Sequence, residues 1–216
     1  MARKERAIGW WAVLPLVSWL AAGCGASFER SPSAGAGGLT DGPTRWLMLP
    51  EEVRQAERLR TAREAIEFIE AFWRRRDPDP ATPGNEFEKT FNQRVEAADR
   101  LYAEEGGRRG SLTDCGRVLI LLGPPPIQRY SQKRVPAWEP GKPGARAPMR
   151  TRNLTLLIWV YPVKSLPPAM VKLLGGGNER AAPEEIALTF QVEPDGTHLI
   201  EGEKYLDMAV RAAIRE

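Results

Sequence analysis

Carboxylates are the side chains in this sequence that come nearest to a catalytic or metal-binding pattern. Such groups work in pairs as general acid and base, or together as ligands of a hard cation. The candidates are Asp77, Asp79, Glu86, Glu88 and Asp114. Each also has a structural use, as a helix cap, a turn former or an ion-pair partner of Arg75, Arg76 or Arg94. We favour the structural use, expect no metal and no cofactor, and keep Asp114, Arg75 and Arg94 as the catalytic candidates.

Histidine and cysteine are too scarce for the usual nucleophilic or zinc sites. His198 is the one histidine, and Cys24 and Cys115 are the two cysteines. His198 lies on a predicted edge hairpin, so we expect no Ser-His-Asp set, and the cysteines are too few for a thiolate zinc cage. A Cys115–His198 pair is conceivable, but a free cysteine is more often a small buried hydrophobe.

The stretch from Gly110 to Pro125 contains Asp114 and organises the rest of the chain. A glycine-bounded turn with Thr113 and Asp114 precedes an apolar run that ends at Gly123-Pro124-Pro125. We predict that 117–122 is a buried strand, and that the side chains of Thr113 and Asp114 bond to backbone amides in the turn before it.

This stretch and two others resemble the GWxTD domain, a family of exported bacterial proteins without an established activity. The likeness covers about residues 45–200, with Ser111 standing where the family has the tryptophan of its name. The residues that carry it are Phe72, Trp73, Arg76, Asp77, Pro78, Asn85, Glu86, Arg94, Gly110, Thr113, Asp114, Gly116, Gly123, Pro124, Pro125, Trp159 and Tyr161.

The N-terminal residues have the pattern of a bacterial lipoprotein signal. Arg3, Lys4 and Arg6 precede an apolar segment without charge, which ends at Ala21-Ala22-Gly23-Cys24. We predict a signal peptide over 1–23, a lipid on Cys24, and a location in the cell envelope on the periplasmic or outer-membrane face. The alternatives are ordinary cleavage nearby or an uncleaved anchor. Small and polar residues over 24–44 predict a flexible tether.

One domain over 45–216 is predicted to be α+β, with N-terminal helices packed on a mainly antiparallel sheet of three to four strands and a C-terminal helix. Caps and apolar periodicity predict helices over 50–59, 62–76, 203–215 and from Asn85 to the glycines at 106–107. Besides 117–122, strands are predicted over 154–161, 186–192 and 197–200.

Residues 123–153 hold the strongest local charge. Their net charge is +6, against +3 for the whole chain. We predict a mobile basic loop that binds an anionic lipid, a cell-wall polymer or an acidic protein through Arg129, Lys133, Arg134, Arg146, Arg150 and Arg152. The alternative is a solvated insertion without a ligand. Signal cleavage would remove part of the positive charge, so we expect no nucleic-acid partner.

The sequence as a whole therefore favours a lipid-anchored binding or assembly module of the cell envelope over an enzyme. The alternative is an envelope hydrolase that uses carboxylates near Asp114. The surroundings of Asp114 discriminate between them: several acids and an arginine in a cleft would favour the hydrolase, and a carboxylate bonded to backbone amides would favour the module.

Overall fold

The computed structural model describes residues 37–137 and 150–214 of the chain. Its helices are α1 (Gly37–Asp41), α2 (Pro50–Ala56), α3 (Ala62–Arg74), α4 (Glu86–Leu101), α5 (Asp114–Leu122), α6 (Pro168–Leu174) and α7 (Glu203–Ala212). Four 3-10 turns are η1 (Pro43–Leu47), η2 (Gly110–Leu112), η3 (Val163–Ser165) and η4 (Glu179–Ala181). Within the predicted tether, residues 37–41 thus form α1 and residues 43–44 begin η1.

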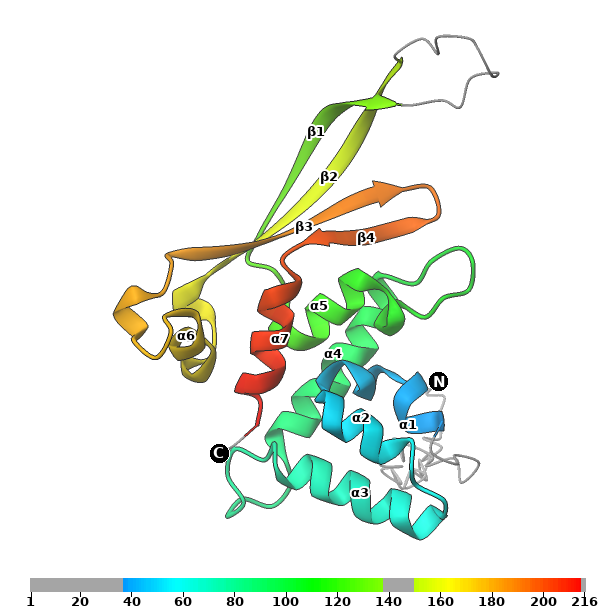
Figure 1. The fold of residues 1–216 in the computed structure, drawn as a ribbon, viewed down its shortest axis with the longest axis vertical. Helices are drawn as coiled ribbons and strands as arrows, with labels where there is room; N and C mark the ends of the chain where they lie inside the picture. Colours follow the sequence, from blue (N-terminus) through cyan, green and yellow to red (C-terminus); the bar gives the residue numbers. More distant parts are fainter. Residues whose placement is uncertain (1–36, 138–149, 215–216) are drawn as a thin grey trace, which may run out of the picture. The chain divides into compact units, whose positions relative to one another are not determined.

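The sheet is antiparallel and its four strands follow the order of the chain (Figure 1). They are β1 (Ile127–Ala137), β2 (Arg150–Pro162), β3 (Glu185–Glu193) and β4 (Gly196–Glu201). The α+β class, the antiparallel sheet and the terminal helices are confirmed.

Local sequence explains where the helices begin. The hydroxyl of Thr61 accepts a hydrogen bond from the backbone N–H of Glu64, whose carboxylate accepts one from the N–H of Thr61, which is a capping box. The side chain of Asn85 accepts a hydrogen bond from the N–H of Glu88 and so caps α4. Both starts agree with the sequence-based predictions.

The predicted strand over 117–122 is wrong, because these residues belong to helix α5. Thr113 caps this helix, since its hydroxyl accepts a hydrogen bond from the N–H of Gly116 at 3.1 Å. Gly123 ends it with a φ of 83°, a value that a residue with a side chain rarely adopts. A short apolar run fits a buried strand and a buried helix equally well, and here the cap decides.

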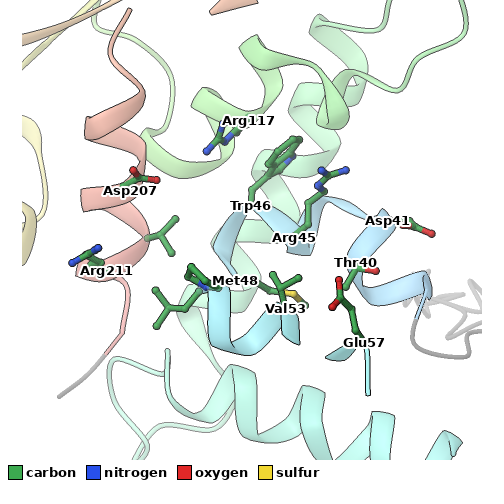
Figure 2. Close-up of a pocket in the computed structure, with 13 residues that line it drawn as sticks. Thr40, Asp41, Arg45, Trp46, Met48, Val53, Glu57, Arg117, Asp207 and Arg211 are labelled. Atoms are coloured by element: carbon green, nitrogen blue, oxygen red, sulfur yellow. The ribbon is translucent and has the colours of Figure 1, made fainter. Parts of the chain in front are cut away.

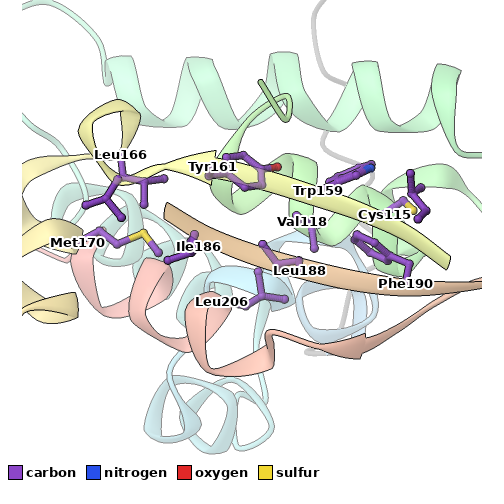
Figure 3. Packing of buried hydrophobic residues seen from close by; sticks show 12 residues of the cluster. Cys115, Val118, Trp159, Tyr161, Leu166, Met170, Ile186, Leu188, Phe190 and Leu206 are labelled. Atoms are coloured by element: carbon purple, nitrogen blue, oxygen red, sulfur yellow. The ribbon is translucent and has the colours of Figure 1, made fainter. Parts of the chain in front are cut away.

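Helix α5 is shared between the two hydrophobic clusters of the described fold. Cys115 and Val118 pack in the cluster formed with the sheet, α6 and α7, where Trp159, Leu188 and Phe190 are fully buried (Figure 3). Leu119 and Ile120 pack in the cluster formed with η1, α2, α3 and α4. The first helices therefore contact the sheet side of the fold through α5.

Candidate functional site

Asp114 joins α5 to the far edge of the sheet. Its Oδ2 accepts a hydrogen bond of 2.8 Å from the backbone N–H of Leu199 in β4, which lies 85 residues further along the chain. The sequence predicted that Asp114 would bond to amides of its own turn, but Thr113 has that role. Its hydroxyl donates to the carbonyl of Gly110 at 2.8 Å and caps α5.

The turn before Asp114 is too tightly packed to hold a substrate. A Cβ atom added to Gly116 would lie 1.8 Å from the carbonyl oxygen of Gly110, and one added to Gly110 would lie 2.0 Å from that of Ala98. Ser111 is fully buried between these glycines. The glycines of the motif thus allow backbone segments to approach one another.

Arg75 and Arg76 both bind Glu52 in α2. The guanidinium of Arg76 and the carboxylate of Glu52 are each about 1% exposed, and Nη2 lies 2.7 Å from Oε2. The guanidinium also donates to the backbone carbonyls of Leu47 and Phe72. Burial lowers the pKa of Arg76, while the hydrogen bonds and charge of Glu52 oppose that shift. Arg75 is partly exposed and reaches Glu52 at 2.6 Å.

Arg94 lies at the opposite end of α5 from Asp114. It donates hydrogen bonds to the carbonyls of Ile120 and Leu121 at 3.0 and 3.4 Å, so a cation meets the negative end of the helix dipole. At 1.5 Å per residue, these carbonyls are roughly 10 Å from Asp114 along the helix axis. The three catalytic candidates Asp114, Arg75 and Arg94 are therefore not brought together.

Other residues of the resemblance also stabilise the fold. The phenol of Tyr161 donates to the carbonyl of Gly123 at 2.9 Å, and the amide of Asn85 donates to that of Trp73 at 2.7 Å. Asp77 accepts a hydrogen bond from the N–H of Asp79, whose own carboxylate accepts one from the N–H of Ala81. Phe72 and Trp159 are fully buried, and Pro78 and Pro124 are exposed turn residues.

Cys115 and His198 have separate surroundings. Cys115 is 3% exposed, and burial, with the negative charge of Asp114 adding to it, raises the pKa of its thiol to about 12. A neutral thiol is a poor nucleophile. His198 lies on edge strand β4, with Nε2 at 3.7 Å from a carboxylate oxygen of Asp195. Among the described residues, Glu193, Asp195 and His198 are a group with metal-ligand spacing, but exposed clusters of this kind are common without an ion, and we assign none.

The predicted basic loop is largely a β-hairpin. Strands β1 and β2, here called the basic hairpin, extend past the ends of β3 and β4 (Figure 1). The prediction of a loop was wrong for 127–137 and 150–153. The sequence did not indicate a strand here, because β1 is exposed almost throughout and so lacks the alternation of apolar and polar residues that marks a half-buried strand. Arg146 lies outside the described residues, and Arg150 begins β2.

Four basic side chains of the hairpin are described, and all are exposed: Arg129, Lys133, Arg134 and Arg152. None has an ion-pair partner among the residues that the structure describes. Strand register places Arg129, Lys133 and Arg152 on the face opposite Leu157 and Trp159, which point into the core. Leu154, Leu156 and Ile158 share that outer face and are only half-buried.

A cleft that the sequence analysis missed lies between the N-terminal helices and α7 (Figure 2). Its lining residues come from α1, η1, α2, α5 and α7, elements far apart in the sequence. Because its residues have no common motif or spacing, only the tertiary fold identifies it.

No protein-family model, no curated protein and no solved structure matches this chain. The likeness to the GWxTD family therefore rests on the motif residues given above. Within the described part of the chain, none of the helices has the length and apolar character needed to span a membrane.

Proposed function

We propose that this protein is an exported, lipid-anchored, GWxTD-like binding module of the cell envelope, and that its basic hairpin binds an anionic membrane surface. The observation that carries the proposal is the outer face of this hairpin. Three exposed basic side chains, which have no ion-pair partner in the described part of the chain, border a row of half-buried aliphatic residues there. A surface with both features suits the boundary between lipid headgroups and acyl chains.

Electrostatic attraction alone would bind the hairpin to an anionic membrane only weakly. A basic residue near an anionic bilayer contributes roughly 1 kcal/mol, so the three on the outer face contribute roughly 3 kcal/mol, which alone corresponds to binding weaker than about 1 mM. A lipid on Cys24 would hold the domain near the membrane and raise its effective concentration there. A lipid and a basic patch together are a common pair of membrane signals.

The alternative, a hydrolase using carboxylates near Asp114, has less support. The carboxylate of Asp114 accepts a backbone hydrogen bond from Leu199, and neither Arg75 nor Arg94 is its partner. This arrangement is expected of a residue that stabilises the fold, and it differs from that of a catalytic group, which contacts a reacting atom.

The membrane proposal is tested by co-sedimentation of the domain, without residues 1–36, with phosphatidylglycerol vesicles at low and physiological salt. We expect binding at low salt that weakens as salt rises. A variant with Arg129, Lys133, Arg134 and Arg152 changed to serine should lose it. The matched control changes four exposed arginines in α2, in α3 and in the segment between them. These are Arg54, Arg58, Arg60 and Arg74, and the control should bind like the native domain. Equal loss in both variants would show that net charge, not the hairpin, drives binding.

The lipid anchor is tested separately on the full chain expressed in bacteria. Mass spectrometry of the purified protein should show a mature N-terminus at an acylated Cys24. An unmodified Cys24, or a different first residue, would contradict the anchor without affecting the vesicle experiment.

A further inference from the structure

The cleft between the N-terminal helices and α7 has no part in the interactions described so far. Its volume is about 590 Å³. Pockets that bind small molecules generally measure about 300 to 1,000 Å³ and combine an apolar lining with a few polar groups. The size of this cleft therefore fits a small organic ligand.

Trp46 forms a fixed wall of the cleft. Its indole N–H donates a hydrogen bond of 2.8 Å to the carbonyl of Ser111. The guanidinium carbons of Arg45 and Arg117 lie 4.7 and 5.0 Å from the centre of its ring, and Figure 2 shows them on either side of it. Cation–π contacts of this kind orient both guanidinium groups.

The lining carries three cations, Arg45, Arg117 and Arg211, and three acids, and Arg117 is the least exposed of these charged groups. The side chain of Arg117 is 19% exposed, and Glu203 contacts its Nη1 at 2.6 Å. Its Nε is buried and has no hydrogen-bond partner in the described structure. The acids at the cleft, Asp41, Glu57 and Asp207, are all exposed. Water and salt screen exposed charges more than buried ones, so Arg117 acts more strongly on a ligand inside.

Apart from Thr40 and Arg211, the remaining lining is apolar. Met48 and Val210 are each 7% exposed, and Leu49 and Val53 are half-buried beside them. Together with the ring of Trp46 they offer a surface for a hydrocarbon or aromatic body, which would be stabilised by about 25 cal/mol for each Å² removed from water.

We infer that this cleft binds a small amphipathic anion. Its apolar body lies against Met48, Val53 and Val210, and its carboxylate, sulfonate or phosphate group lies near Arg45 and Arg117. Arg45 supplies an exposed guanidinium that has no ion pair among the described residues, and Arg117 retains donors that Glu203 does not use. These two guanidinium groups, beside the apolar wall, thus favour a molecule that is anionic at one end.

The inference is tested with 8-anilinonaphthalene-1-sulfonate, a fluorescent aromatic sulfonate, and with decanoate as its competitor. Arg45→Gln should weaken binding of the dye by about fivefold, the effect of losing one charge contact. The matched control is Arg54→Gln, which removes an exposed arginine from α2 that does not line the cleft, and it should change binding less than about twofold. Thermal melting checks that both variants are folded.

Two further measurements define the ligand class. Decanoate should displace the dye, and 1-decanol, which has the same chain without the charge, should displace it at least about tenfold less well. Val53→Glu, which places an acid on the apolar wall, should abolish binding. Equal binding by Arg45→Gln and Arg54→Gln, or equal displacement by decanoate and decanol, would overturn the inference.

Discussion

The carboxylate of Asp114 is bonded to the backbone N–H of Leu199 at 2.8 Å, so the first residue of α5 is fastened to β4. The acidic residue also lies in the first turn of the helix, where a negative charge is favourable. Helix α7 follows β4 directly, so this bond fixes the approach of the chain to its last helix. The residue that looked most like a catalytic acid thus has a clear structural role.

Asp114→Ala should lower the free energy of unfolding by about 1 to 2 kcal/mol, because it leaves the N–H of Leu199 without its acceptor and removes a charge from the helix N-terminus. Urea unfolding followed by circular dichroism measures this. Asp207→Ala, on the exposed side of α7, is the control and should change stability by less than about 0.5 kcal/mol. Equal stability of both variants would contradict the structural role of Asp114.

Glu52→Gln should destabilise the protein by about 3 kcal/mol or more, because Arg76 would keep a buried charge without its anionic partner. Arg75→Gln removes the partly exposed partner of the same carboxylate and should cost less than about 1 kcal/mol. Chemical denaturation of the two variants gives the comparison. A larger effect of Arg75→Gln would show that the buried pair is not the stabilising one.

Asp99 should make stability depend on acid pH. Partial burial raises the pKa of its carboxyl, but hydrogen bonds from Arg109 and from the N–H of Ser111 outweigh burial and hold the pKa below its usual range. A group with a lowered pKa in the folded state stabilises the fold above its unfolded pKa of about 3.9, and this contribution is lost as the pH falls through the folded pKa.

The unfolding free energy of the native protein should therefore fall more steeply below about pH 4 than that of Asp99→Asn. Above about pH 5 the native protein should be the more stable of the two. Glu105→Gln, an exposed acid in the same region, serves as the control and should keep the steep dependence. Parallel curves for native and Asp99→Asn would contradict this account.

Local signals in the sequence were enough to predict most helix starts. The Thr61 and Asn85 caps act within three residues, so they can be recognised without knowing the fold. Strands β2 and β3 were predicted because they contribute Trp159, Leu188 and Phe190 to the core and are rich in apolar residues. Burial on at least one face leaves a pattern in the sequence.

Helices α1 and α6 were not predicted, and neither were strand β1 and helix α5, whose residues lack such a pattern. Strand β1 is held by its pairing with β2, and its side chains are exposed, so polar residues fill it. Helix α5 is buried on both sides between two clusters, so its apolar run has no helical period. Tertiary contacts could not be predicted either, because only the folded chain brings their residues together. They are the hydrogen bond between Asp114 and Leu199, the ion pair between Arg76 and Glu52, and the contacts that form the cleft.

The most direct test of the proposed membrane role is a charge series on the basic hairpin, measured as the vesicle-bound fraction at low salt. In one variant Arg129, Arg134 and Arg152 become lysine, and in the other these three and Lys133 become serine. If charge on the hairpin binds the anionic surface, the lysine variant should partition within about twofold of the native domain, and the serine variant should lose roughly tenfold or more. A serine variant that binds phosphatidylglycerol vesicles as well as the native domain would contradict the proposal.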